Sequence, residues 1–265
     1  MSDLKFACHL IQFGGEQQEN PEKVLGEVAE AGWEGVESVP ISSSESLVEM
    51  ATLARSLGLH IVNAGGDGLD RVKHNVTLGN NAAEVPALRR GDWGGADPSD
   101  QDFENAARTL DEILDYCVKH DIKGFHHAHL WTMIETVEDA ERLLSVAPNL
   151  WLLYDTGHLL AAGSDPMDVF ESDILRNRIG HVHLKDCHAD DPATWDYRNQ
   201  RFGEKARFAE LGAGNLGLDV KAVLKELEAI GYDGWVSNEL DHPYPERPPA
   251  EAAKVNREYL SSLGY

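Results

Sequence analysis

Side chains that commonly bind metal ions follow a series of apolar segments in this chain of 265 residues. They stand where these segments end, at His127 and His129, Asp155, His183 and Glu239. A single histidine at such a position is more often a hydrogen-bonded structural residue. Burying several carboxylates and imidazoles together is costly unless a cation compensates them. Four such segment ends therefore predict a divalent metal site.

Two carboxylates combined with imidazole nitrogen suit Mn²⁺, Mg²⁺, Co²⁺ or Zn²⁺, and the absence of thiolates argues against a structural zinc site. We predict one bound divalent ion with Mn²⁺ as first choice, although the residue types do not select among the four. Water or substrate oxygens would fill the remaining coordination positions.

The apolar segments alternate with amphipathic ones. Strands are predicted over residues 6–10, 35–39, 60–64, 124–129, 151–155, 179–185 and 234–239. Helices are predicted over 21–31, 44–57, 101–119, 137–146, 166–176, 220–230 and 250–263. This alternation and the chain length predict an α/β fold, a TIM-type (β/α)8 barrel formed as a single domain by residues 1–265. The C-terminal strand ends of such a barrel meet at one rim, where active sites lie.

The eighth strand of this barrel is predicted to be irregular or missing. The polar stretch 67–100 offers only residues 75–78 as a weak strand candidate. Because long ordered loops in compact domains are usually functional, the stretch is interpreted as a lid over the site or as a disordered insertion, and the sequence leaves both open.

Composition excludes several partners. Lys and Arg number 23 against 46 Asp and Glu, a net charge of −23 that opposes binding to nucleic acid or anionic lipid. No apolar window reaches 18 residues, and the first five residues resemble no signal peptide, so no membrane span is expected. Cys8, Cys117 and Cys187 are far apart, which predicts free thiols and a cytoplasmic location. A homo-oligomer is left open.

Motifs in the second half of the chain, over about residues 124–265, resemble the xylose-isomerase-like TIM-barrel superfamily. They are Asp155-Thr156-Gly157-His158, His181-Val182-His183-Leu184-Lys185-Asp186, Gly212-Ala213-Gly214 and Asn238-Glu239-Leu240. This group contains ketose epimerases, sugar isomerases, inosose dehydratases and apurinic endonucleases of the endonuclease IV type. The first hundred residues match mainly in pattern, through residues 31–37.

The resemblance implies that Asp155, His183 and Glu239 are metal ligands and that His158 contacts substrate hydroxyls. Family epimerases also have a ligand glutamate six residues before a substrate-contacting Glu-Thr pair. Aligning on Glu135-Thr136 places His129 at that ligand position, so His129 is the predicted fourth ligand. The two ligand glutamates of those epimerases act as opposed bases, and a histidine in place of one argues against symmetrical two-base epimerisation.

The segments 127–136, 239–241 and 256–260 look most like the myo-inosose dehydratases, which eliminate water β to a ketone. The resemblance thus implies a metal-dependent lyase that removes the proton α to the carbonyl of a keto-polyol or keto-sugar, a carbohydrate or cyclitol, to give an enediolate. The candidate bases are Glu239, Glu135, His129 and His158, and Lys185 is the candidate to protonate the leaving hydroxide or to hold the oxyanion. Substrate contacts are predicted for His127, His158, Glu135, His9 and Arg201.

Two other functions stay open. A sugar isomerase or epimerase would use the same metal site, and a sugar-binding protein or a partner subunit of a multi-chain enzyme would not catalyse by itself. A DNA-repair endonuclease is disfavoured, because the second strand offers only Glu37 and no histidine and the charge opposes DNA binding. The isolated Gly212-Ala213-Gly214 has no accompanying basic cluster, which favours an unphosphorylated substrate.

Overall fold

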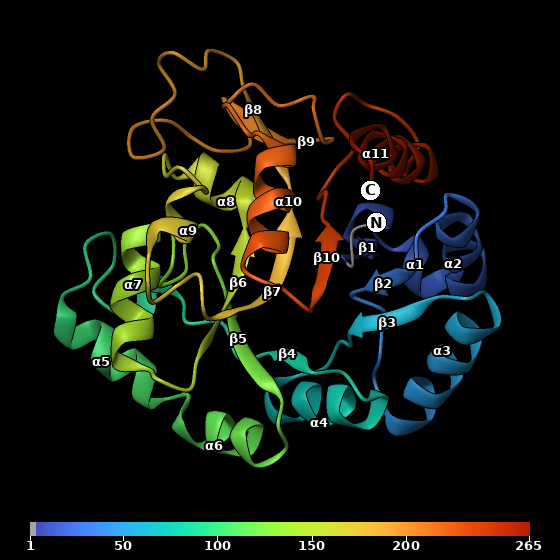
Figure 1. The fold of residues 1–265 in the computed structure, drawn as a ribbon, viewed down its shortest axis with the longest axis horizontal. Coiled ribbons are helices and arrows are strands. Elements are labelled where there is room, and N and C mark those ends of the chain that lie inside the picture. The colour runs from blue at the N-terminus through green and yellow to red at the C-terminus, as the bar shows by residue number, and fades with distance from the viewer. Residues whose placement is uncertain (1–3) are drawn as a thin grey trace.

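Eight parallel strands form a nearly closed ring in the computed structural model, with helices around its outside (Figure 1). The structure describes residues 4–265. The expectation of no signal peptide concerns the first five residues, of which residues 1–3 lie outside the described part. The strands run in the order β3-β2-β1-β10-β7-β6-β5-β4. They are β1 (Lys5–His9), β2 (Gly35–Glu37), β3 (His60–Asn63), β4 (Ala82–Glu84), β5 (Lys123–His127), β6 (Trp151–Asp155), β7 (Ile179–Leu184) and β10 (Trp235–Asn238). The predicted TIM-type barrel is confirmed, with one open seam between β3 and β4, which are neighbours without a hydrogen-bonded ladder in the described chain.

The helices that cover the barrel begin with well-defined caps. The longer ones are α2 (Pro21–Glu30), α3 (Ser44–Ser56), α4 (Gly68–Leu78), α5 (Asp100–Arg108), α6 (Asp111–Lys119), α7 (Val137–Val146), α10 (Val220–Ala229) and α11 (Pro249–Leu263). The short ones are η1 (Leu10–Phe13), α1 (Glu16–Glu19), η2 (Arg90–Asp92), α8 (Thr156–Ala161) and α9 (Asp168–Glu171). Capping boxes at Ser43, Ser99 and Thr136 open α3, α5 and α7 and satisfy the first free N–H groups of each helix.

The stretch 67–100 differs from its predicted form. Residues 75–78, the weak strand candidate, lie in α4, and the eighth strand is the three-residue β4 that follows. The Asn75 side chain accepts a hydrogen bond from the Ala64 N–H at 2.9 Å and donates to the Arg71 carbonyl, which fixes α4 beside the end of β3. The stretch therefore completes the barrel rather than forming a disordered insertion.

Two other predicted elements are divided or shortened. The helix predicted over 101–119 is two helices, α5 and α6, because the chain breaks at Thr109, whose hydroxyl donates to the Ala106 carbonyl at 2.6 Å. The helix predicted over 166–176 is regular only in α9.

A hairpin that the sequence did not predict lies in the polar segment 186–210. It pairs β8 (Asp186–Ala189) with β9 (Ala206–Ala209) in antiparallel register. Its Cys187 and Phe208 pack with Leu130, Leu160 and Leu240 in a small hydrophobic cluster, separate from the main core between strands and helices. The hairpin thus packs against residues that follow β5 and β10.

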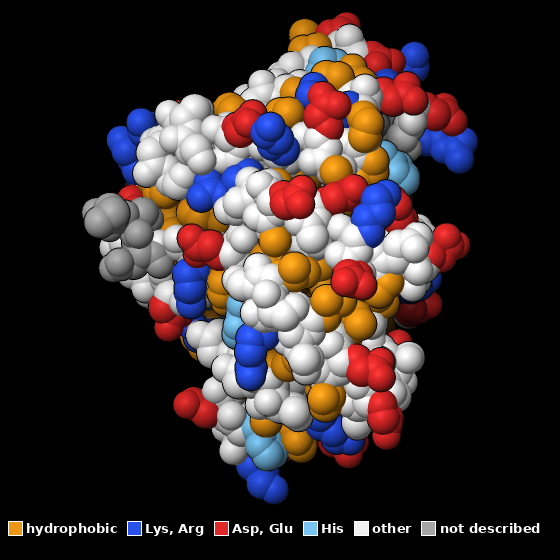
Figure 2. Space-filling model, turned by 90° about the vertical axis from the view of Figure 1, so that its right-hand side faces the viewer, with side chains coloured by type: hydrophobic (Ala, Val, Ile, Leu, Met, Phe, Trp, Pro, Cys, Tyr) orange, Lys and Arg blue, Asp and Glu red, His pale blue; other side chains and the backbone are white. Residues whose placement is uncertain are grey.

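The surface agrees with the composition. Figure 2 shows acidic side chains spread over the visible face and interspersed with basic ones, not gathered into one patch. Among residues 4–265, no helix is long and apolar enough to cross a membrane. The three cysteines are free and buried, and burial raises the pKa of the Cys8 thiol to about 12.

The start of β2 gives a test of barrel packing. A Cβ atom on Gly35 would lie 2.8 Å from the Trp235 ring and 2.9 Å from the Val62 side chain. We expect Gly35→Ala to lower the free energy of unfolding by about 1–3 kcal/mol, because the neighbours must move. Gly26→Ala on α2, where no atom lies within 4 Å, should instead raise it by about 0.5–1 kcal/mol. Chemical denaturation measures both, and equal effects would contradict this packing.

Candidate metal centre and active site

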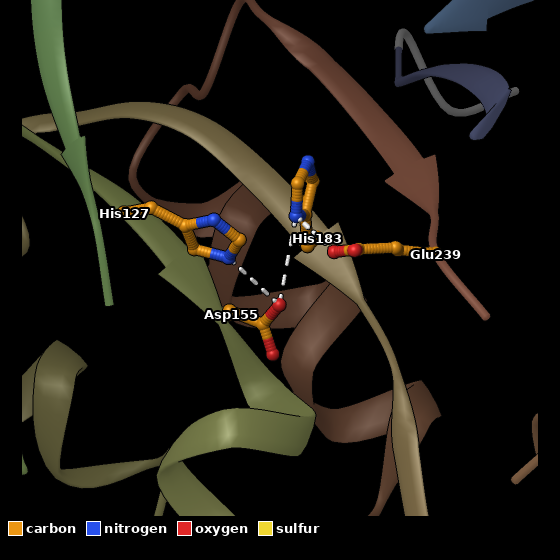
Figure 3. A group of neighbouring side chains, drawn as sticks. All are labelled: His127, Asp155, His183 and Glu239. Carbon is orange, nitrogen blue, oxygen red and sulfur yellow. Dashed lines mark hydrogen bonds and ion pairs between the residues drawn. The ribbon is translucent and has the colours of Figure 1, made fainter. Parts of the chain in front are cut away.

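Four metal-binding side chains meet at the C-terminal rim of the barrel. His127 ends β5, Asp155 ends β6, His183 lies in β7, and Glu239 directly follows β10. One ligand atom from each lies within 4.8 Å of the others. Figure 3 shows the four side chains pointing toward one another from four different strands. We call them the four-residue centre.

Close polar contacts link the four residues. His127 Nε2 lies 3.1 Å from Asp155 Oδ2, and His183 Nδ1 lies 3.5 Å from the same oxygen. His183 Nδ1 also lies 2.5 Å from Glu239 Oε2. His127 is partly exposed and the other three are buried, so the centre opens toward solvent on the His127 side.

Glu37, at the end of β2, orients His183. Its Oε1 lies 3.1 Å from His183 Nε2, and its Oε2 lies 2.7 Å from His181 Nε2. Burial raises the pKa of Glu37, but the two histidines outweigh burial and hold that pKa well below its usual value. When the neutral His183 ring donates Nε2–H to this carboxylate, Nδ1 presents its lone pair to the centre, as a metal ligand must.

A second glutamate faces His127 on its other side, beyond hydrogen-bond distance. Its Nδ1 lies 4.0 Å from Oε1 of Glu84, which ends β4 and pairs with Arg71. Burial lowers the pKa of His127 to about 3. The ring is therefore neutral at physiological pH, which is the form that binds metals.

The donor set fits a divalent cation. His183 Nδ1 and Glu239 Oε2 are buried and face each other without a hydrogen bond of good geometry. Burial raises the pKa values of Asp155 and Glu239, but Lys185 and the nearby histidines outweigh burial and hold both well below the usual range. Two ionised carboxylates and two imidazoles would hold Mn²⁺, Co²⁺ or Zn²⁺ well, and the set is less typical of Mg²⁺.

Lys185 is a fully buried cation beside this centre. Its Nζ lies 3.1 Å from Glu239 Oε2, 3.7 Å from Asp155 Oδ2 and 3.4 Å from His158 Nε2. Burial lowers the pKa of Lys185, but the carboxylates outweigh burial and raise that pKa above its usual value. A Cβ on Gly157 would lie 2.5 Å from Lys185 Cγ, so the glycine leaves room for this side chain.

Two other predicted residues lie beside the centre. His158 is buried in α8, its Nδ1 accepts from the Leu130 N–H at 3.3 Å, and burial together with Lys185 holds its pKa well below the usual value. His9, at the end of β1, has its ring centroid 5.4 Å from that of His183, and its Nδ1 accepts from the Ile11 N–H at 3.2 Å. A substrate-binding role for each stays a prediction.

The predicted ligand His129 lies outside the four-residue centre, where the structure has His127 instead. Because β5 ends at His127, the side-chain alternation of a strand does not extend to His129. The His129 ring packs on His158 at 3.7 Å between centroids, and its Nδ1 lies 2.7 Å from the Leu130 carbonyl oxygen.

Glu135 and Arg201 also lie apart from the centre. Glu135 is buried, and its Oε1 accepts from the Trp131 N–H at 2.7 Å and from the Tyr197 hydroxyl at 2.9 Å. Arg201 is exposed and pairs with Glu204. Both Glu135 and Arg201 line a second cavity at the rim. Their predicted contacts with substrate at the metal centre therefore lack support from this geometry.

The sequence offers Glu37, at the end of the second strand, as a residue that contacts substrate or orients a neighbouring ligand, but Glu84 was missed. Both glutamates end short strands at the barrel rim, as Asp155 does, which is a usable signal. For Glu84 the signal was hidden, because three residues of strand between two polar stretches give little periodicity to detect.

The family model described as "Xylose isomerase-like TIM barrel" matches residues 25–263. This chain belongs to that family. The predicted resemblance is thus confirmed, and the match includes β2, β3 and β4, where the sequence motifs were weak.

The chain is similar to some known proteins in sequence and to others in fold. The inosose dehydratase of Clostridium tetani is 30% identical over 165 residues, which cover 61% of this chain and 55% of that protein. The match therefore spans about half the length of the curated relatives. The probable 3-DHS dehydratase AsbF of Bacillus anthracis has a TM-score of 0.71 and 18% identity, covering 97% of this chain and 99% of that one. A xylose isomerase-like TIM barrel protein from Mycobacterium smegmatis in complex with magnesium has a TM-score of 0.72 and 18% identity, covering 99% and 98%.

The exposed side of this family member's centre opens into a cavity of about 440 Å³. Its lining includes Glu84, Arg89, His127, His129 and Trp131. This volume lies within the range of small-molecule sites, so a single sugar-sized ring could reach the four-residue centre from here.

Metal titration of variants tests the ligand set. We expect Asp155→Asn, Glu239→Gln and His127→Gln each to weaken Mn²⁺ binding by about 100-fold or more, since each removes a ligand atom. The matched variant His129→Gln should change it by less than about threefold, because its ring lies outside the centre. Isothermal titration calorimetry with Mn²⁺ gives the affinities. A large loss in His129→Gln with none in His127→Gln would show that the ligand is His129.

Metal binding should also release a proton. Burial lowers the pKa of His183, but Glu37 and Glu239 outweigh burial and hold it well above its usual value in the metal-free protein. Binding at pH 7 must displace that proton, so affinity should rise by about tenfold per pH unit until pH passes this pKa. Calorimetry in two buffers of different ionisation enthalpy measures the release. Binding without proton release would mean that His183 is already neutral.

Proposed function

We propose that this chain is a divalent-metal-dependent lyase that acts on a keto-polyol or keto-sugar, with an inosose as the first substrate to test. The observation that carries the proposal is the four-residue centre with the buried cation Lys185 beside it. The inosose dehydratases among the relatives support the lyase assignment. We further propose Mn²⁺ as the resident ion, because two imidazole ligands favour it over Mg²⁺.

The metal would be held by His127, Asp155, His183 and Glu239, and when bound it would polarise the substrate carbonyl and stabilise the enediolate charge. Glu239 is the base, because its carboxylate lies at the centre beside Lys185, within reach of a carbon next to a carbonyl bound there. It removes the proton on the carbon α to the carbonyl.

Lys185 is the acid that completes the elimination. It donates a proton to the hydroxyl that leaves from the β carbon, so that water departs and a carbon–carbon double bond forms. The proton on Glu239 then returns to Lys185 across the 3.1 Å contact between them. One water is lost from the substrate, and both side chains recover their charge.

A sugar isomerase or epimerase would share the enolisation but lose no water. The centre has a histidine, His127, on the strand where the resemblance places a ligand glutamate of the epimerases. This leaves Glu239 without the opposed glutamate of a symmetrical two-base reaction, which favours the lyase. The cytoplasmic location stays a prediction.

Product absorbance decides between the two reactions. The Mn²⁺-loaded protein should convert scyllo- or myo-inosose into a product with enone absorbance, and removal of the metal with a chelator should abolish the conversion. An isomerase or epimerase would give no enone. A sugar-binding protein or a partner subunit would neither form an enone nor exchange the α-proton with deuterium from solvent.

Lys185→Met separates the two proton transfers. We expect enone formation to fall by about 10²–10⁴-fold, the usual contribution of a general acid. Exchange of the substrate α-proton with D₂O should persist, because Glu239 is unchanged. Mn²⁺ affinity serves as the control and should be retained, since Lys185 is not a ligand. Equal loss of exchange and elimination would contradict the assigned division of roles.

A further inference from the structure

A second cavity, of about 770 Å³, lies at the barrel rim beside the mouth of the metal centre. Its lining includes Arg90, Trp131, Glu135, Tyr197, Arg198 and Arg201. Small-molecule sites commonly have this size. The proposed reaction uses none of these six residues, yet two of them, Glu135 and Arg201, are side chains that the sequence predicts to bind substrate.

Trp131 joins the two cavities, because it lines both. Ring centroids lie 5.0 Å apart between His127 and His129 and 6.2 Å apart between His129 and Trp131. His129 thus lies between the ligand His127 and the indole of Trp131. A ring bound in the smaller cavity beside His127 would therefore share that cavity with Trp131, which also lines the second cavity.

The backbone of Trp131 is held in an unusual conformation. Its φ is +68°, in the left-handed region that costs free energy for a bulky residue, and 59% of the residue is exposed. Its N–H donates to Glu135 Oε1 at 2.7 Å. The buried carboxylate of Glu135 thus holds a strained loop in place. The loop exposes the ring of Trp131 to solvent, where the ring contributes little to the packing of the protein.

The polar groups of this cavity suit hydroxyls better than an anion. Glu135 Oε2 is buried without a hydrogen bond, 3.3 Å from Arg90 Nε and 3.6 Å from Arg198 Nη1. Arg90 also pairs with Asp139, and Arg201 pairs with Glu204. Because these guanidinium groups face carboxylates, they leave no cluster of free positive charge for a phosphate among the described residues.

We propose that this second cavity binds a second hydroxylated ring carried by the substrate. Trp131 would stack on the apolar face of that ring, and Glu135, Tyr197 and Arg198 would bind its hydroxyls. The substrate class is then a glycoside of a keto-sugar, with the keto ring at the metal and the second sugar in this cavity. The inference rests on the proposed function for the keto ring, but the binding of the second ring is independent of turnover.

Binding of unreactive sugars tests the second cavity. Calorimetry on the full, Mn²⁺-loaded chain would compare methyl β-D-glucoside with three disaccharides, cellobiose, maltose and trehalose, and with phenyl β-D-glucoside. We expect at least one disaccharide to bind tenfold or more tightly than methyl glucoside. Equal affinity of all three disaccharides and methyl glucoside would overturn the proposal. If phenyl β-D-glucoside bound as tightly as the tightest disaccharide, the proposal would also be overturned, since contacts with the hydroxyls of the second ring would then contribute nothing.

Two variants test whether the higher affinity for a disaccharide arises in the second cavity. Tyr197→Ala and Arg198→Gln should each remove most of the disaccharide advantage, and both positions are partly or largely exposed, so the fold tolerates them. Tyr116→Ala on α6, where the tyrosine stacks on His120, is the matched control and should keep the advantage. A gain that persists in both Tyr197→Ala and Arg198→Gln would overturn the proposal.

The two proposals fail separately. Absence of an enone from inosose, with a disaccharide advantage that depends on Tyr197, would reject the lyase and keep the second-ring site. Enone formation without any disaccharide advantage would keep the lyase and reject the second-ring site.

Discussion

Compensation of buried negative charge is the constraint on which this barrel rim depends. Asp155, Glu239 and Glu37 are all buried, and each carboxylate is stable there only because positive or hydrogen-donating groups surround it. Lys185 supplies one charge and His183 bridges two of the carboxylates. A divalent ion would take over the part of this compensation that protonated His183 provides in the metal-free protein.

The same constraint applies to the two glutamates, on β2 and β4, that face the histidines of the centre. Each imidazole of the four-residue centre turns one nitrogen inward and the other toward a glutamate at the rim. Glu37 of β2 serves His183 of β7 from across the barrel, and Glu84 of β4 faces His127 of the adjacent β5. Ligand orientation therefore needs the closed ring, because β2 and β7 are brought within hydrogen-bond distance only by the curvature of the sheet.

The sequence predicted most of the barrel and three members of its centre, because regular strands with a polar last residue leave a clear pattern. Asp155 is such a residue, and His183 and Glu239 lie within one residue of the ends of β7 and β10. The pattern fails where elements are short or irregular. β4 has three residues, and the β8–β9 hairpin lies in a polar segment without periodicity. The sequence favoured His129 over His127 as the fourth ligand, because the choice depends on the residue at which β5 ends, and strand ends are the least certain part of a sequence prediction.

The irregular loop after β5 is where the two sites at the rim become connected. Directly after His127 the chain leaves the strand, packs His129 against His158, and turns at Trp131 with a positive φ that Glu135 stabilises. One short segment thus provides a ligand to the metal centre at its start and a carboxylate to the second cavity at its end. Because both ends are anchored by buried contacts, the loop holds Trp131 at a fixed place beside the metal centre. Selection for a larger substrate would act on this loop and leave the metal ligands unchanged.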